Sequence, residues 1–511
     1  GDLELNAAVC HSWTGGVSDL EERFRAAADW YAKADSTAGV ALSHLAAVRA
    51  RLNTGTWGQG IDVSELEDQL DLLVDDHPEL AALVQADLAM ALWVGGQSRP
   101  AAEAARVAVR MAEQADSHAA GARAHTALGL SLLTELELAE SRAAFERGLE
   151  IAEAGDDPLE QLMVLIRLPL ATGLLGDTRA CRQYAERARD LCRRLDSPHD
   201  AEFALAALCN LAGTRGDLIS VEQLGAEVRS IARLTGSPWT LPFVLAATAA
   251  TRAVHGDVAG AGAALHDLLP RDPGLAAWVA DSPTHRVMAG YLACLAGDPA
   301  EAARQVTHEV VHDLLEQPAV LGNGAYLAAV VETAAALDQP ALADAVRPAL
   351  ADLVHRGQVC AAGMPFLLPR SLGLAERLRG RLDEAKRLLE EALDVARRED
   401  LDVERVRALL DLADVASLEG RTRPATDLRA TAAADIRRMG LWGLATRAGV
   451  RPPTPGTRAA VVEEPVEALA VVRSVILFAD ISASTRLTEE LGDVAFRYRA
   501  RQADAAMRSA V

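Results

Sequence analysis

Apolar residues recur at every third position ahead of a series of regularly spaced glycines. Leu372, Ala375 and Leu378 precede Gly380, and the same spacing recurs before Gly420. After Gly380 the segment LDEAKRLLEEALDVARRED carries a second apolar stripe at helical spacing. Such stripes are typical of amphipathic helices. The pattern therefore predicts a helix–turn–helix unit that cannot bury its own apolar stripe and must stack against neighbouring units.

The turn positions form an internal repeat of about forty residues. Successive turns are separated by 40, 40, 40, 40, 41, 41, 42 and 40 residues, and a fixed period in this range is typical of a helical solenoid. Several turns read Gly-Asp, in which the glycine ends one helix in the left-handed conformation and the aspartate caps the next. The predicted turns lie at Gly96, Leu136, Gly176, Gly216, Gly256, Gly297, Asp338, Gly380 and Gly420.

The segment Ala124–Ala152 resembles a tetratricopeptide repeat, and Gly380–Ala396 fits the same pattern. The usual repeat of that family is about 34 residues long, whereas the period here is about 40. The resemblance implies a superhelix over residues 1–447, with a concave face that binds a protein, a peptide or a small effector; a simple spacer is the alternative. The matching positions in the first segment are Leu128, Gly129, Leu132, Ser141, Phe145 and Gly148.

The composition suits closely packed helices. Half of the 511 residues are hydrophobic and only 4% are aromatic, which favours helices over a β-sandwich. The formal net charge of −22 repels phosphate backbones and argues against nucleic-acid binding. No apolar run is long enough to predict a transmembrane helix, and the first residues, GDLELN, lack the basic region of a signal peptide.

The positions of the cysteines and lysines bear on the cellular compartment and on one class of nucleotide site. The six cysteines have no C-x-x-C spacing, and we interpret them as small buried residues in a reducing compartment. We therefore expect a cytoplasmic protein. The only lysines are Lys33 and Lys386, and neither follows a glycine. This excludes a G-x-x-x-x-G-K-[ST] phosphate loop within the chain.

One short motif matches a zinc protease. Residues 308–312 read HEVVH, and Glu332 follows at a distance that suits a third ligand. The helical register argues against a metal site. A helix predicted over residues 299–315 places Ala302, Val306, Val310 and Leu314 inward and leaves His308 and His312 on its polar face. We therefore predict a solvated helix surface.

The pattern changes after residue 447. Residues 448–470 include the proline-rich stretch RPPTPGT and are predicted to form a linker. The run VVRSVILFAD then reads as a buried strand that ends at Asp480. Ser484 and Thr485 offer caps for a following helix with Leu487 and Leu491 on its apolar face. An unrelated α/β start, such as a receiver-like strand, shows the same local pattern.

Residues 471–511 resemble the first strand, loop and helix of class III nucleotide cyclases. The residues that carry the resemblance are FADI, then ST, then ELGD. It implies that Asp480 and the Ile481 carbonyl bind two Mg²⁺ or Mn²⁺ ions, and that Ala483, Ser484 and Thr485 hold the nucleotide phosphates. The family often has glycine where this chain has Ala483. A strand-end carboxylate suits a divalent metal, and a helix N-terminus suits phosphate.

The sequence therefore predicts a mainly α protein. We expect an α-solenoid of tetratricopeptide-like hairpins, followed by the start of an α/β, ferredoxin-like cyclase domain. The resemblance implies conversion of ATP (or GTP) to a cyclic nucleotide and pyrophosphate by a homodimer. The second metal aspartate would follow residue 511, so we expect this chain alone to be an inactive piece of a longer protein. The alternatives are a non-enzymatic interaction scaffold and the regulatory array of a larger ATPase.

Overall fold

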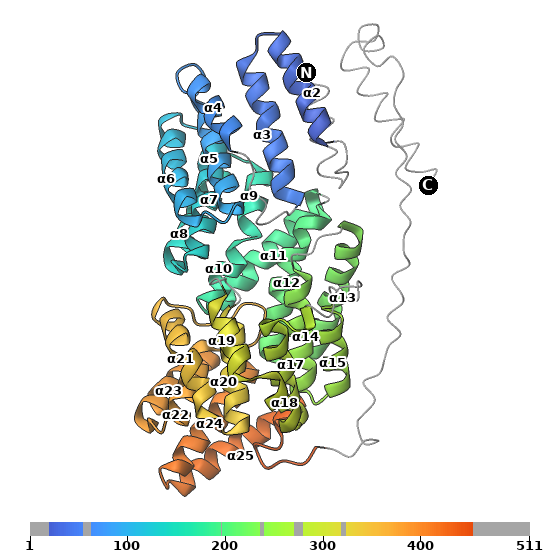
Figure 1. Cartoon of the computed structure of the whole chain (residues 1–511), viewed down its shortest axis with the longest axis vertical. Coiled ribbons are helices and arrows are strands. Elements are labelled where there is room, and N and C mark those ends of the chain that lie inside the picture. Colours follow the sequence, from blue (N-terminus) through green and yellow to red (C-terminus); the bar gives the residue numbers. More distant parts are fainter. Residues whose placement is uncertain are drawn as a thin grey trace, which may run out of the picture. The chain divides into compact units, whose positions relative to one another are not determined.

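The computed structural model describes residues 20–54, 63–195, 197–235, 240–269, 279–317 and 323–452. These residues form α-helices joined by short turns (Figure 1). The described part contains no β-strand, only an isolated bridge between Cys360 and Leu367. The predicted strand at 471–480 lies outside the described residues. The helices are α2 (Leu20–Lys33), α3 (Thr37–Thr54), α4 (Ser64–Leu73), α5 (Pro78–Val94), α6 (Ser98–Gln114), α7 (His118–Thr134), α8 (Leu138–Ala154), α9 (Pro158–Leu165), α10 (Leu168–Leu174), α11 (Thr178–Leu195), α12 (Pro198–Arg215), α13 (Leu218–Thr235), α14 (Leu241–Val254), α15 (Val258–His266), α17 (Pro283–Ala296), α18 (Pro299–Gln305), α19 (His308–Glu316), α20 (Asn323–Leu337), α21 (Pro340–His355), α22 (Leu368–Leu378), α23 (Leu382–Arg398), α24 (Asp402–Leu418), α25 (Thr422–Met439) and the 3₁₀ helix η1 (Trp442–Leu444).

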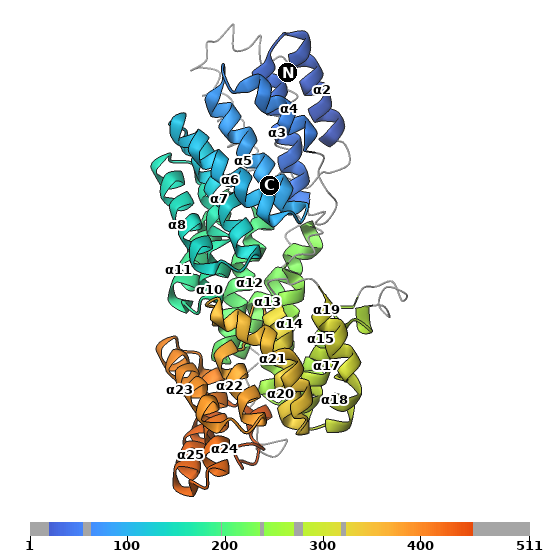
Figure 2. The same cartoon turned by 60° about the vertical axis from the view of Figure 1, so that its left-hand side comes forward.

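The chain divides into two compact units, Gly1–Pro452 and Pro453–Val511. All described residues belong to the first unit, which is a repeated array of helical hairpins (Figure 2). The mainly α, helical-repeat prediction is therefore confirmed for this unit. Within the described residues, no helix has both the length and the apolar character needed to cross a membrane.

Each of the nine predicted turns adopts the left-handed backbone conformation. Their φ angles run from 53° at Asp338 to 82° at Gly256. Glycine reaches this region without steric cost, and aspartate is one of the few other residues that visits it routinely. Leu136, with φ 61°, is the unusual member, because a leucine side chain disfavours this conformation by about 1–2 kcal/mol.

The aspartates of the Gly-Asp turns cap the outgoing helices as predicted. A side-chain oxygen of each accepts a hydrogen bond from the backbone N–H three residues later, at 2.9–3.1 Å. This satisfies one of the orphan donors in the first turn of each helix. The four caps are Asp177, Asp217, Asp257 and Asp298.

A second series of turns alternates with the first and was not predicted. Asp116, Asp156, Asp400 and Gly440 also have positive φ angles, between 49° and 71°. Asp116 and Asp156 are 40 residues apart, as are Asp400 and Gly440. These turns join one hairpin to the next. Their signal in the sequence was an aspartate, or the glycine at position 440, both of which tolerate the left-handed region.

The tetratricopeptide-like positions pack closely between α7 and α8. Phe145 is fully buried, and a Cβ added at Gly129 would lie only 2.6 Å from its ring. Ser141 donates a hydrogen bond to the Gly129 carbonyl at 2.7 Å. Small residues at 129 and 141 therefore let the two helices approach, and Phe145 fills the space beside them.

The helix predicted over residues 299–315 is broken. The prediction is wrong, because α18 ends at Gln305 and Val306, with φ −106° and ψ 88°, leaves the helical conformation. The Thr307 side chain accepts a hydrogen bond from Val310 N at 3.3 Å and starts α19 anew. The structure has another break, between α9 and α10, near Pro169, whose backbone nitrogen has no hydrogen to donate to the preceding turn.

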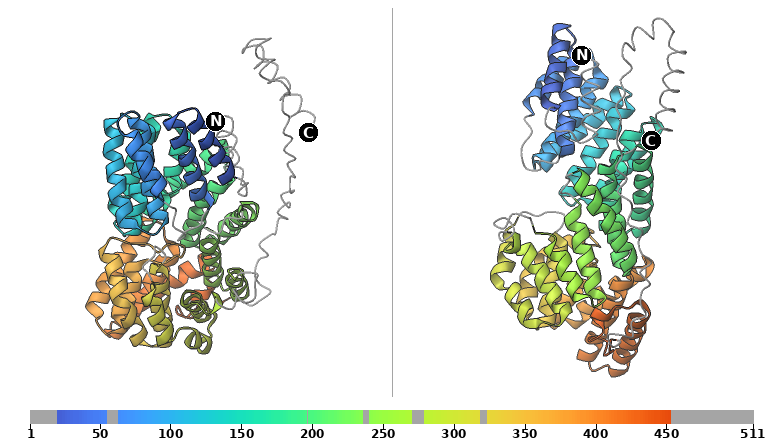
Figure 3. Two further views of the ribbon diagram at one scale, coloured as in Figure 1. Left: turned by 45° about the horizontal axis from the view of Figure 1, so that its top comes forward. Right: turned by 90° about the vertical axis from the view of Figure 1, so that its right-hand side faces the viewer.

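Distant repeats meet along one series of turns. The N–H groups of Val359 and Cys360 both donate to the Leu174 carbonyl, and Thr178 is bonded to Glu399, 221 residues away. The views in Figure 3 show the orange C-terminal helices beside the green helices of the middle of the array. This unit is therefore stabilised by contacts between distant hairpins as well as by contacts between neighbouring ones.

Candidate functional site: an arginine-lined pocket between distant repeats

The residues assigned by the cyclase resemblance lie outside the part of the chain that the structure describes. They are Asp480, Ile481, Ala483, Ser484 and Thr485. Most of the predicted linker, 448–470, also lies outside it. Their roles stay predictions.

The zinc-protease motif has no metal-binding geometry. His308 and His312 are both exposed on α19, while Val310 is buried, as the register predicts. Glu332, the candidate third ligand, is instead paired with Arg370. No group of three or more His, Cys, Asp or Glu side chains among the described residues is arranged to hold a metal ion.

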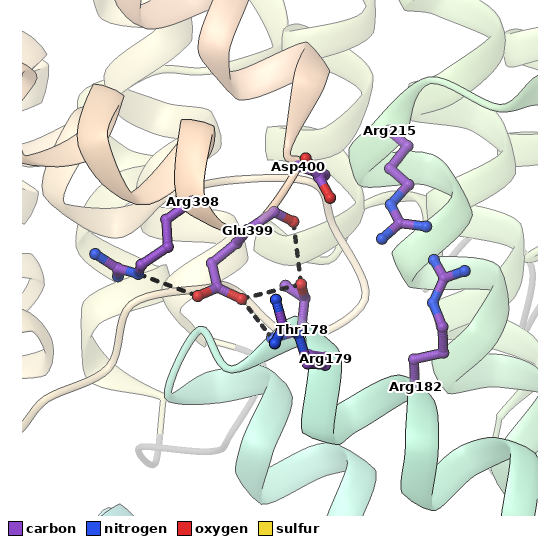
Figure 4. A pocket seen from close by; sticks show the side chains of 7 residues that line it. All are labelled: Thr178, Arg179, Arg182, Arg215, Arg398, Glu399 and Asp400. Atoms are coloured by element: carbon purple, nitrogen blue, oxygen red, sulfur yellow. Dashed lines mark hydrogen bonds and ion pairs between the residues drawn. The ribbon is translucent and has the colours of Figure 1, made fainter.

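A pocket of about 170 Å³ lies where distant repeats meet (Figure 4). One wall comes from the start of α11 and the end of α12, and the other from the turn between α23 and α24. Four arginines and two carboxylates line it. The lining residues are Thr178, Arg179, Arg182, Arg215, Arg398, Glu399 and Asp400.

Glu399 holds the two walls together. Its Oε2 accepts hydrogen bonds from the Thr178 N–H and hydroxyl, both at 3.2 Å. Its backbone carbonyl accepts a bond from the Thr178 hydroxyl at 3.0 Å, and its Oε1 accepts one from Arg398 Nε at 3.2 Å. The Glu399 carboxylate is therefore already engaged and does not neutralise the remaining arginines.

The guanidinium groups of Arg182 and Arg215 point toward one another on the α11–α12 wall of the pocket (Figure 4). Both side chains are half-buried. Neither forms an ion pair with a carboxylate of another described residue, whereas most arginines of α22–α25 do. With four arginines against Glu399 and Asp400, the lining carries a formal charge of +2 in a chain of charge −22.

A second polar feature is an ionic network buried inside the array. Arg370 on α22 is fully buried among three carboxylates. Its Nε donates to Glu404 Oε2 at 2.7 Å, its Nη1 donates to Asp411 Oδ2 at 2.6 Å, and its Nη2 donates to Glu332. Because Glu332 lies on α20 and the other two on α24, one guanidinium joins three helices. Buried charges are tolerated only when they are paired in this way.

Arg407 extends the network to α17. Its Nη1 donates to Glu404 Oε1 at 2.9 Å, and its Nη2 donates to the Tyr291 hydroxyl. Its guanidinium carbon lies 5.3 Å from the centroid of the Phe366 ring and 5.7 Å from that of Tyr291, which are cation–π distances. Burial raises the pKa of Tyr291. The network therefore keeps a neutral phenol beside a charged guanidinium.

A smaller network occupies related positions near the N-terminus. Arg123 on α7 pairs with Asp87 of α5, at 3.4 Å, and with Glu160 of α9. The three residues of this network lie 9, 13 and 16 positions before the turns that follow them, which are Gly96 for Asp87, Leu136 for Arg123 and Gly176 for Glu160. The same three spacings separate Asp411, Arg407 and Glu404 from the turn at Gly420. Charged residues at these repeat positions were the sequence signal for the buried ion pairs, and our sequence analysis missed it.

Five of the six cysteines lie in the described part of the chain, and their surroundings disfavour the reactive thiolate. Cys181, Cys192 and Cys209 are buried, as predicted, and Cys294 and Cys360 are partly buried. Burial raises the pKa of the first three thiols to about 12 and that of Cys294 to about 11. These thiols stay protonated near neutral pH and are poor nucleophiles.

Comparison with known proteins adds little to this geometry. No family model matches the chain, and no curated protein matches it. Among solved structures, it is similar to a protein described as a circular tandem repeat protein with novel repeat topology and enhanced subunit contact surfaces. That match has 14% sequence identity and a TM-score of 0.14, and it covers 86% of this chain and 95% of that one. A TM-score this low carries no argument, so the helical-repeat assignment rests on the turns and hairpins of the structure itself.

Proposed function

We propose that the chain is the regulatory part of a signalling protein, built from tetratricopeptide-like hairpins, whose output is a class III nucleotide cyclase. The observation that carries the proposal is the segment VVRSVILFADISAST, where an apolar run ends in an aspartate and a Ser/Thr loop follows. In this proposal Asp480 and Ile481 bind Mg²⁺ or Mn²⁺. Ala483, Ser484 and Thr485 bind the phosphates of ATP, or of GTP, and the complete protein acts as a homodimer.

The end of the array supports a regulatory link. A Cβ added at Gly216 would lie 3.1 Å from Leu441, and one at Gly256 would lie 3.3 Å from Trp442. The His255 Nε2 also lies 2.8 Å from the Gly216 carbonyl oxygen. Leu441 and Trp442, which follow the last long helix of the array, are thus in contact with the turns α12–α13 and α14–α15. A ligand that shifts these turns would shift the chain that leads into the proposed cyclase.

Disturbing this contact is expected to change cyclase turnover. We predict that Gly216→Ala in the complete gene product alters the rate of cyclic nucleotide formation by at least about twofold, because changes along a coupled element shift coupling by about 0.5–2 kcal/mol. Gly297→Ala is the matched control. Gly297 has a similar φ, 76° against 71°, but a Cβ there meets no atom within 4 Å.

Both variants carry the same left-handed strain, so a difference between them reports the contacts of position 216 with Leu441 and Val403, at 3.1 and 3.2 Å from the added Cβ. Rates are measured at saturating ATP, and the circular dichroism of each variant is compared with that of the wild type. Equal rates in the two variants would contradict regulation through this contact.

The alternative proposal is a non-enzymatic interaction scaffold. It is favoured by the helical-repeat architecture, because stacked hairpins offer extended surfaces for a protein or peptide. The two proposals differ in a result that can be measured. If the protein is a scaffold, the wild type forms no cyclic nucleotide. Substitutions at Asp480 then leave the binding of its protein or peptide partner unchanged.

A further inference from the structure

We propose that the pocket between α11, α12 and the α23–α24 turn binds the phosphate group of a small molecule. The inference does not depend on the proposed cyclase, because every residue that it uses belongs to the helical array. It assigns a ligand class to a site that neither the motifs nor the comparisons suggested.

The charge of the pocket favours an anion. Two guanidinium groups, Arg182 and Arg215, face each other without a carboxylate partner among the described residues (Figure 4). Like charges held close together are unfavourable unless an anion lies between them. Guanidinium groups match phosphate oxygens in a bidentate geometry, which makes arginine the usual residue for this task. Arg179 lines the same pocket and adds a third cation.

Hydrogen bonds hold the nearest carboxylate away from these arginines. Glu399 is bonded to Thr178 and Arg398, so it is not free to move in and neutralise Arg182. The volume of about 170 Å³ is far above the roughly 10–15 Å³ that a single water requires. The pocket therefore has both the room and the uncompensated charge for a phosphate group.

The position of the pocket implies a consequence of binding. Arg182 and Arg215 come from the middle of the array, whereas Asp400 comes from the turn between α23 and α24. A phosphate would bridge α11 and α12 beside the Thr178–Glu399 bond. It would stabilise the contact between these two helices. Phosphate binding should therefore slow hydrogen exchange at the start of α11 and at the end of α12.

The test is calorimetric titration of the 511-residue chain with pyrophosphate at low salt, with EDTA present to remove divalent metals. We expect saturable binding that weakens at least tenfold in the double variant Arg182→Gln/Arg215→Gln, because charge-assisted hydrogen bonds are lost. Arg194→Gln is the matched control, since Arg194 lies on the same helix, is exposed and is not part of the pocket. Binding in this variant should equal that of the wild type.

A second variant predicts a change of opposite sign. Asp400→Asn removes the acidic charge, and asparagine tolerates the φ of 56° at this position. Pyrophosphate binding should therefore tighten by about threefold or more, as expected when a nearby like charge is removed. A weaker affinity in Asp400→Asn would overturn the electrostatic assignment.

Two further ligands identify the source of the phosphate. Tighter binding of ATP than of inorganic phosphate points to a nucleotide, and equal binding points to the free anion. The proposal is overturned if pyrophosphate does not bind, if the double variant binds as well as Arg194→Gln, or if citrate at equal ionic strength binds equally. Because EDTA excludes metal-dependent binding at Asp480, failure here leaves the cyclase proposal untouched.

Discussion

Replacing Arg370 with glutamine is expected to lower the free energy of unfolding by about 3–5 kcal/mol. The substitution removes the cation that Glu404 and Asp411 share. Among the described residues, Glu404 keeps only Arg407 as an ion-pair partner and Asp411 keeps only Arg447, so part of the desolvation cost of these buried carboxylates is left uncompensated. The change is measured by urea denaturation of the 511-residue chain, monitored by circular dichroism at 222 nm. The unfolding transition is compared for the wild type and the variant under the same buffer conditions.

Arg387→Gln is the control for this prediction. Arg387 also pairs with two carboxylates, Glu384 and Glu391, but it is 58% exposed. Exposed pairs contribute about 1 kcal/mol or less. A cost for Arg370→Gln no larger than that for Arg387→Gln would contradict the assignment of a tightly paired buried network.

The same network predicts a pH dependence. Burial by itself would raise the pKa of Asp411, but Arg447, Arg370 and Arg377 outweigh it and lower this pKa to about 2. A carboxyl whose pKa is lower in the folded state stabilises the fold above its unfolded pKa, near 4, and loses that contribution as the pH falls toward 2. In Arg370→Gln one of these cations is missing, so acid unfolding should begin at a higher pH than in the wild type.

Phe145→Ala is expected to destabilise the array by about 3–5 kcal/mol, because it removes a fully buried ring from the α7–α8 contact. A second substitution, at Gly129, tests the same contact from the facing helix. Gly129→Ala in the wild type places a Cβ 2.6 Å from the Phe145 ring and should cost about 1–3 kcal/mol by overpacking. In the Phe145→Ala background the clash is absent, and the better helix propensity of alanine should make the same change neutral or stabilising by up to about 1 kcal/mol.

The double-mutant cycle is measured by urea denaturation and should give a coupling energy of at least about 1 kcal/mol. Gly121→Ala is the control on the same helix, since a Cβ there meets Ile151 at an ordinary 3.4 Å. It should cost the same in both backgrounds. A cost of Gly129→Ala that is independent of Phe145 would show that the α7–α8 packing is not as described.

The local structure was largely predictable from sequence. The turns at Gly176 and Gly216 adopt the left-handed conformation, and Asp177 and Asp217 cap the following helices, as the Gly-Asp pattern predicts. These features depend on residues only a few positions apart. The break at Val306 was missed, because apolar spacing continues across it and Thr307 caps α19 in the middle of the predicted helix.

The candidate site was not predictable in the same way. The pocket joins Arg182 and Arg215 to the turn near Glu399. That contact depends on small rotations that accumulate from one hairpin to the next, and a repeat period does not contain them. The burial of Arg370 has the same origin, since a lone arginine on a helix is ordinarily exposed. The repeated spacing of charged residues before each turn can be read from the sequence. Which of these residues are buried depends on the neighbouring helices, which the sequence pattern does not place.

The measurement that tests the account most directly is cyclic AMP formation from ATP by the complete gene product, with Mn²⁺ or Mg²⁺ present. The comparison is between the wild type, Asp480→Asn and the matched control Glu489→Gln, which lies in the same segment but outside the residues assigned to metal or phosphate. The account predicts turnover in the wild type and the control, and a rate at least about a hundredfold lower in Asp480→Asn with unchanged circular dichroism. No cyclic nucleotide from the wild type, or full activity in Asp480→Asn, would contradict the cyclase proposal and favour the scaffold.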